Sequence, residues 1–124
     1  MSAHTEPVSI WVGDFASEAE LEGYLAIDYS EIHDDDDFLA SAFTQDFEIE
    51  YYDEDCREAY RAEIGGLSWQ ELVEPLSYAE YFADQIPDTI DEKTCVIAVY
   101  NLAFDGHITH KNGVVFVGCY EYHR

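Results

Sequence analysis

The chain of 124 residues has 28 acidic residues against five lysines and arginines, for a formal net charge of −23, and 48% of its residues are hydrophobic. This charge excludes nucleic acid and anionic membranes as ligands, because both need cationic residues to neutralise them. Seven phenylalanines, ten tyrosines and two tryptophans supply more burial than acidic disordered chains carry, so we expect one globular domain spanning residues 1–124.

The chain shows no signal for export or for a disulfide framework. Its first residues contain no basic segment followed by an apolar run, and no stretch approaches the length needed to cross a bilayer. We therefore expect a cytoplasmic protein. Cys56, Cys95 and Cys119 are an odd set without CxxC spacing, which argues against disulfides and against a zinc knuckle.

A strand and a helix are predicted first along the chain. Residues 8–13, VSIWVG, are β-branched and aromatic, which is typical of a short buried strand. Ser17 and Glu20 have the spacing of a capping box, and apolar residues behind them recur at helical intervals. We expect this helix to reach about Ile27.

Two more helices are predicted over the acidic segment that follows. The apolar pattern of residues 38–47 indicates one helix, and the aspartates at 34–37 would then lie at its N-terminal turn, where the helix dipole favours carboxylates. Asp53 is positioned to cap the other helix, with Cys56, Tyr60 and Ile64 on one face. The two glycines at 65 and 66 would end it.

Two further capping boxes predict short helices in the middle of the chain. Ser68 stands three residues before Glu71, and Ser77 stands three residues before Glu80. A proline follows each expected helix and ends it. These prolines are Pro75 and Pro87.

The C-terminal part predicts two strands. Residues 94–104 and 113–122 are dense in valine, tyrosine, isoleucine and phenylalanine and are separated by turn residues, so we expect them to pair as an antiparallel hairpin. The element order predicts an α+β fold. In it, a small antiparallel sheet of the N-terminal strand and this hairpin has several helices packed on one face.

The sequence contains no complete motif for binding a metal or a cofactor or for catalysis. A calcium loop starting at Asp34 would have Leu39 at its glycine position and Gln45 at its bidentate acid position. His107 and His110 lie in the predicted turn, and no third zinc ligand stands at a usual spacing. No nucleophile or phosphate-binding motif is present, so we expect no enzyme activity and no cofactor.

Two acidic segments are candidates for a binding surface. Residues 48–60, EIEYYDEDCREAY, mix acids with tyrosines, and two interpretations stay open: a buried aromatic face with solvated acids, or an interface. Tyrosines are favoured at interfaces, and carboxylates attract the basic residues of a partner. The candidate partner-binding residues are Asp34, Asp35, Asp36, Asp37, Glu48, Glu50, Tyr51, Tyr52, Asp53, Glu54 and Asp55.

The negative charge is uneven along the sequence. Residues 14–60 hold 17 acids and one arginine, net −16, whereas residues 93–124 hold two acids and three bases, net +1. Self-repulsion in such a field destabilises the compact state, which is easier to understand if the charge attracts a cationic protein. A divalent-cation-binding protein without enzymatic activity is the alternative.

Several stretches in a fixed order resemble a known family. They are Ser9-Ile10-Trp11-Val12-Gly13, Ile27-Asp28-Tyr29-Ser30, Asp46-Phe47 followed by Ile49-Glu50-Tyr51-Tyr52-Asp53-Glu54-Asp55, Ser77-Tyr78 and Val99-Tyr100-Asn101. Together they resemble the bacterial immunity protein 22 family, from Val8 to about Tyr122. The resemblance leads us to expect glycine where Glu48 stands and a larger apolar residue where Cys56 stands.

The resemblance implies a function without catalysis. It implies a cytoplasmic α+β antidote of a bacterial polymorphic toxin system that binds and neutralises a cognate toxin. Toxins that act on nucleic acid have basic clefts, so the acidic charge leads us to expect a basic nuclease as the toxin.

Overall fold

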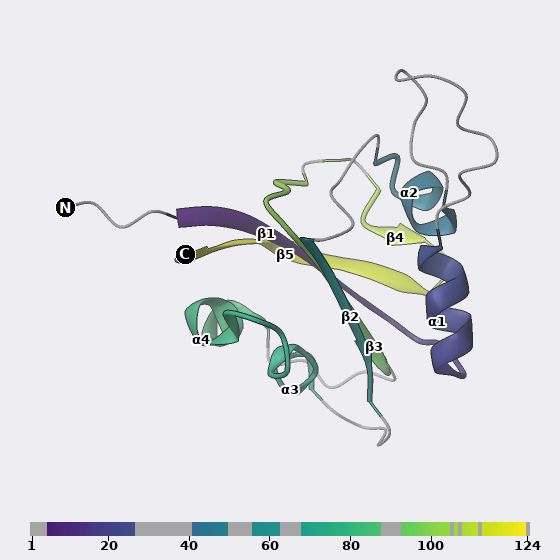
Figure 1. Ribbon diagram of the computed structural model, residues 1–124, viewed down its shortest axis with the longest axis horizontal. Coiled ribbons are helices and arrows are strands. Elements are labelled where there is room, and N and C mark those ends of the chain that lie inside the picture. The colour runs from purple at the N-terminus through teal and green to yellow at the C-terminus, as the bar shows by residue number, and fades with distance from the viewer. Residues whose placement is uncertain are drawn as a thin grey trace.

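Five strands form one antiparallel sheet within the part of the chain that the structure describes (Figure 1). The computed structural model describes residues 5–26, 41–49, 56–62, 68–87, 93–104, 106, 108–111 and 113–123. The sheet has the order β2-β3-β1-β5-β4, so β1 is central. The strands are β1 (Thr5–Gly13), β2 (Arg57–Arg61), β3 (Cys95–Tyr100), β4 (His110–Lys111) and β5 (Val114–His123).

Helices cover both faces of this sheet (Figure 1). They are α1 (Glu18–Leu25), α2 (Ala42–Asp46), α3 (Trp69–Val73), α4 (Ala79–Phe82) and the 3₁₀ helix η3 (Ala83–Gln85). Val8, Ile10 and Val12 of β1 pack against α3 and α4, whereas Trp11 packs against α1 and α2. Within the described residues, none of these helices is long and apolar enough to cross a membrane.

The α+β class and the antiparallel sheet are confirmed, but the prediction that the helices pack on one face is wrong. β3 is buried at all six of its positions, and β1 is buried from Val8 to Gly13. Successive side chains of a strand point to opposite faces. Both faces of these strands are therefore apolar, and each face needs its own layer of helices.

The predicted C-terminal hairpin is also wrong, because β1 lies between β3 and β5 and pairs with both. β3 ends where Asn101 adopts a left-handed conformation, with φ of 65°. The Ser9 hydroxyl of β1 then holds the chain, donating to the Leu102 carbonyl at 2.6 Å and accepting from the Phe104 N–H at 2.9 Å. The hairpin that forms joins β4 to β5 through Gly113, whose φ is 82°.

The first strand and the first helix are confirmed. β1 contains the whole predicted segment 8–13 and extends it to Thr5. The Ser17 hydroxyl caps α1 by accepting the Glu20 N–H at 3.2 Å. The Glu20 carboxylate accepts the Ala16 N–H at 2.8 Å, so this pair forms half of the predicted capping box. α1 ends at residue 25.

α2 begins later than the sequence predicts. Ser41 and Thr44 form a full capping box, with the Ser41 hydroxyl accepting the Thr44 N–H at 3.0 Å. The first turn of α2 therefore contains no acidic residue. The predicted place of residues 34–37 at this turn is wrong, and those residues themselves lie outside the described ranges.

The predicted third helix is a strand over part of its length. β2 pairs antiparallel with β3, with Arg57 opposite Val99 and Arg61 opposite Cys95. The side chains of β2 alternate between the two faces of the sheet with a period of two. The helical face predicted for Cys56 and Tyr60 therefore does not form. Pairing with the buried strand β3 outweighs the weak helical spacing of this segment. The predicted cap Asp53, residue Ile64 and the glycines at 65 and 66 lie outside the described residues.

The two middle capping boxes have different outcomes. The Ser68 box is confirmed: its hydroxyl accepts the Glu71 N–H at 3.2 Å, and the Glu71 carboxylate accepts the Ser68 N–H at 3.0 Å. The Ser77 box is wrong. Ser77 directs its hydroxyl and its N–H to the Glu58 carboxylate instead, and Tyr78 precedes α4 in a left-handed conformation.

Candidate functional site

The structure describes one of the eleven predicted partner-binding residues. Glu48 is exposed and follows the end of α2. The other ten lie outside the described residues, so their predicted role stays a prediction. They are Asp34, Asp35, Asp36, Asp37, Glu50, Tyr51, Tyr52, Asp53, Glu54 and Asp55.

Glu48 occupies a position that suits glycine. Its φ is 55°, and the N–H of Ile49 donates to the Thr44 carbonyl at 2.9 Å while the Glu48 N–H reaches the Gln45 carbonyl at 3.4 Å. This pair of bonds is the Schellman motif that ends many helices, with a left-handed residue after the cap. The structure thus gives a physical reason for expecting glycine at position 48.

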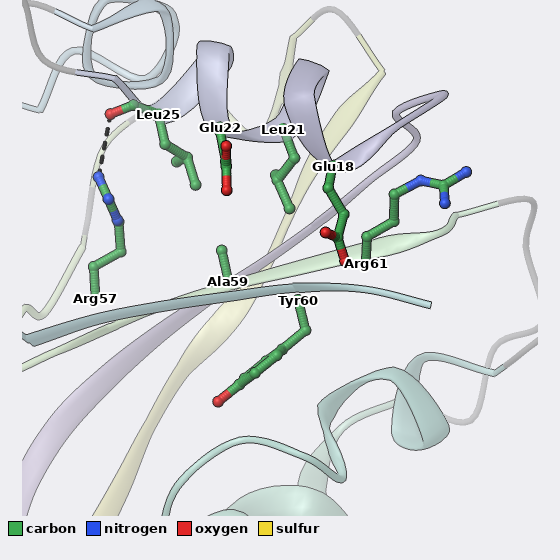
Figure 2. Close-up of a pocket in the computed structure, with 8 residues that line it drawn as sticks. All are labelled: Glu18, Leu21, Glu22, Leu25, Arg57, Ala59, Tyr60 and Arg61. Carbon is green, nitrogen blue, oxygen red and sulfur yellow. Dashed lines mark hydrogen bonds between the residues drawn. The ribbon is translucent and has the colours of Figure 1, made fainter. Parts of the chain in front are cut away.

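A groove lies between α1 and the edge strand β2 (Figure 2). Its volume is about 370 Å³. Figure 2 shows Arg57, Ala59 and Arg61 projecting from β2 toward α1, whereas Tyr60 projects to the opposite face. The groove is lined by Glu18, Leu21, Glu22, Leu25, Arg57, Ala59, Tyr60 and Arg61.

The two arginines of this groove bind backbone carbonyls. Arg57 donates through Nη1 to the Leu25 carbonyl at the C-terminal end of α1, at 3.1 Å (Figure 2). Arg61 donates through Nε to the Phe15 carbonyl and through Nη2 to the Ala16 carbonyl, each at 2.9 Å. These contacts fasten α1 to the edge of the sheet, and we assign the arginines a structural role.

A second cavity, of about 220 Å³, lies where β3 and β5 end and β2 begins, beside α4. We call it the tyrosine pocket, and it is lined by Cys56, Glu58, Ser77, Tyr78, Tyr100, Asn101 and Tyr122. Chain segments that are far apart in sequence supply these residues. Two of them, Ser77-Tyr78 and Tyr100-Asn101, belong to stretches on which the family resemblance rests.

Glu58 is the charged group of the tyrosine pocket. Its Oε1 accepts the Ser77 N–H at 2.8 Å and the Tyr100 hydroxyl at 2.7 Å, and its Oε2 accepts the Ser77 hydroxyl at 2.6 Å. The Tyr100 hydroxyl also lies 2.6 Å from the Ser77 carbonyl. Burial raises the pKa of Tyr100 well above its ordinary value, and the hydrogen bond and charge of Glu58 raise it further. Tyr100 therefore stays a protonated donor.

Three tyrosine rings line the pocket around this carboxylate: Tyr78, Tyr100 and Tyr122. The centroids of Tyr78 and Tyr122 are 4.7 Å apart, and those of Tyr100 and Tyr122 are 5.2 Å apart at 89°. Tyr81 does not line the pocket, and its ring centroid is 6.4 Å from that of Tyr78. Tyr78 has φ of 64°, a left-handed conformation that costs a non-glycine residue roughly 1–2 kcal/mol. The residue is nevertheless 41% exposed, so burial does not explain this strain.

Exposed acids occur in both helical layers. Glu18, Glu20 and Glu22 are exposed on α1, and Glu71 and Glu80 are exposed on the opposite face of the sheet. Among the residues that the structure places, no group of three or more histidines, cysteines and acids is arranged to hold a metal ion. These five glutamates therefore lie at the surface, where their charge attracts cations.

Comparison with known proteins identifies the family of this chain. The family model Immunity protein 22 matches residues 8–123. The chain belongs to the Immunity protein 22 family. This membership gives it a toxin-neutralising immunity role and implies a cognate toxin as its partner. No curated protein and no solved structure matches it.

The tyrosine pocket of this Immunity protein 22 family member cannot be read from the local sequence pattern. Glu58 was expected on a helix, and Ser77 was expected to cap one, so nothing placed them together. Tyr78 stands at helical spacing from Tyr81 and Phe82, which predicts that it lies on the helix, but it precedes α4 in a left-handed conformation. One signal was present: an asparagine directly after a strand, as at Asn101, favours a left-handed turn that ends the strand.

Proposed function

We propose that this protein binds and neutralises a basic nuclease toxin of a bacterial polymorphic toxin system, through an acidic and tyrosine-rich surface. The proposed surface comprises residues 34–37 and 48–55. The protein acts in the cytoplasm as a stoichiometric inhibitor and catalyses no reaction.

The net charge of −23 is the observation that carries this proposal. A field of this size attracts a basic protein over a long range and accelerates encounter. A nuclease needs a cationic cleft to hold phosphates, so its active site is the surface that an acidic inhibitor complements. An inhibitor at this cleft excludes the substrate sterically and repels its phosphates.

The local use of positive charge supports the same proposal. Arg57 and Arg61 are two of the five lysines and arginines, and both donate to backbone carbonyls. They therefore serve the fold at the edge of the sheet. The exposed glutamates of α1 then contribute to a field that these cations offset only in part.

We expect a toxin domain to be encoded beside the gene for this protein, and the test uses that domain. We expect the purified domain to degrade DNA or RNA, and one equivalent of this protein to abolish that activity. Co-expression should rescue cells that the toxin domain kills. A toxin domain that attacks no nucleic acid would refute the nuclease part of the proposal, and failure of rescue would refute the pairing itself.

A further inference from the structure

The tyrosine pocket holds a carboxylate in a fixed position. Glu58 accepts three hydrogen bonds, two from Ser77 and one from Tyr100, and both of its oxygens take part. Such bonds hold the side chain in one conformation before any ligand arrives. A preorganised charge loses little entropy when it binds a partner group.

The hydroxyl protons around Glu58 point into the cluster. Ser77 and Tyr100 donate theirs to the carboxylate, and Tyr122 donates its own to Asn101 Oδ1 at 2.9 Å. Because their protons are engaged, these hydroxyl oxygens are available to a ligand only as hydrogen-bond acceptors. The pocket consequently favours a ligand that brings several hydrogen-bond donors and a positive charge.

The aromatic rings add a second preference. Tyr78 lies at the mouth of the pocket, tilted by 34° to Tyr122 and held in its left-handed conformation. The face of a tyrosine ring attracts a cation, and a planar guanidinium stacks on it. Strained backbone is often retained where it positions a functional side chain, and here it presents an exposed ring beside the half-buried Glu58 carboxylate.

We propose that the tyrosine pocket binds an arginine side chain of the toxin, with Glu58 pairing with the guanidinium and Tyr78 stacking on it. This inference deepens the proposed function and rests on it for the identity of the partner. Arginine fits better than lysine because its guanidinium is planar, weakly hydrated and has five donors. In the sequence, the acidic segment 48–55 directly precedes Cys56, which lines the pocket.

The first experiment needs no toxin. N-acetylarginine amide and N-acetyllysine amide are titrated into the protein at millimolar concentrations, and resonances of Ser77, Tyr78 and Tyr100 are followed by NMR. We expect saturable shifts with the arginine compound, weaker shifts with the lysine compound and none in Glu58→Gln. Absence of saturable shifts, or equal binding of both compounds, would overturn the assignment of the pocket to arginine.

The second experiment measures binding of the toxin domain encoded beside the gene. Glu58→Gln and Tyr78→Ala should each weaken binding by roughly 30-fold or more, as hot-spot residues do. Tyr78→Phe keeps the ring and should bind normally. Two variants serve as controls. Glu80→Gln removes a carboxylate charge at an exposed position of α4. Tyr81→Ala removes the ring of a residue that is as exposed as Tyr78 but does not line the pocket. Both controls should change binding by less than about threefold.

Folding and coupling are checked with the same variants. Thermal unfolding excludes loss of structure, and Tyr78→Phe provides a folded reference for the Tyr78 position. Each arginine of the toxin domain is then replaced by alanine in the background of wild type and of Glu58→Gln. We expect one arginine whose loss costs about 30-fold in wild type and almost nothing in Glu58→Gln.

The outcomes separate this inference from the proposed function. If the toxin is not a nuclease but one of its arginines couples to Glu58, the nuclease proposal is refuted and the binding of arginine in the tyrosine pocket is supported. If the toxin is a nuclease that this protein inhibits without any such coupling, the binding of arginine in the tyrosine pocket is overturned and the proposed function stands. If this protein does not bind the toxin domain, the proposal that a toxin arginine occupies the pocket is overturned, whatever the small-molecule titration shows.

Discussion

Three non-glycine residues in the described part of the chain adopt left-handed backbone conformations: Glu48, Tyr78 and Asn101. Asparagine tolerates this conformation well, whereas glutamate and tyrosine do so at a cost. Asn101 ends β3, and Glu48 ends α2. Tyr78 presents a ring at the tyrosine pocket. Of the two strained residues, Glu48 is a predicted partner-binding residue and Tyr78 is a proposed contact of the toxin arginine.

Replacing Glu48 with glycine tests this cost directly. Glycine adopts a positive φ without steric strain, although it loses more entropy on folding. We expect Glu48→Gly to raise the free energy of unfolding by about 1 kcal/mol, measured by urea denaturation. Glu48→Ala keeps the strain and serves as the control. Equal stability of the two variants would contradict the Schellman geometry at this position.

Buried tyrosines predict how stability depends on alkaline pH. Burial raises the pKa of Tyr24 and of Tyr100 above the ordinary value of 10.0, and a carboxylate beside each raises it further. Above pH 10 the unfolded chain therefore releases protons that the folded chain retains. This stabilising contribution is complete below pH 10 and is lost as the pH rises, so the free energy of unfolding should fall.

Urea denaturation at a series of pH values measures this fall. Tyr100→Phe removes one of the two groups, so its stability should decline less steeply between about pH 9 and pH 11 than that of wild type. Tyr81→Phe, at an exposed position outside the tyrosine pocket, is the matched control. A Tyr100→Phe variant with the same slope as wild type would contradict the protonated, buried state of Tyr100.

At the scale of elements, the hydrogen bonds of two arginines hold the edge strand β2 to the segment that contains α1. Arg61 makes two hydrogen bonds to backbone carbonyls just before α1. Arg61→Met should lower the free energy of unfolding by about 1–2 kcal/mol, allowing for partial exposure of these bonds. Lys111→Met, an exposed substitution on β4 with the same change of charge, is the control. Equal losses in both variants would show that net charge, and not the tether, matters.

Local signals predict the elements of this fold that depend on nearby residues. The buried run of β1, the cap at Ser17 and the capping box at Ser68 are all set within a few residues, and all are confirmed. The position of β2 and the place of β1 between β3 and β5 depend on contacts between distant segments. Such pairings leave little trace in local spacing, which is why helical spacing was misread at β2.

The candidate site follows the same rule. Charge and tyrosine content indicate an interaction surface from sequence alone. The tyrosine pocket required the fold, because Glu58 of β2, Tyr100 of β3 and Ser77 in the turn before α4 meet only when β2 is a strand beside β3. Ser77 would otherwise be read as a helix cap, and its binding to Glu58 would be missed.

At the scale of the whole molecule, charge is the property that links fold to function. The acidic residues repel one another, so they lower the stability of the compact chain. Exposed glutamates on both helical layers extend this field around the sheet. Membership of the Immunity protein 22 family implies a cognate toxin as the partner, and we propose that the charge is retained to attract it.

The most direct test of this account is the association rate constant with the neighbouring toxin domain, measured by stopped flow at increasing salt. We predict a fall of about tenfold or more between about 50 and 500 mM NaCl, because salt screens long-range attraction. Replacing the four aspartates at 34–37 with asparagine should lower the rate at low salt and flatten its salt dependence. A rate constant unchanged by salt and by these substitutions would contradict the claim that the negative charge directs binding.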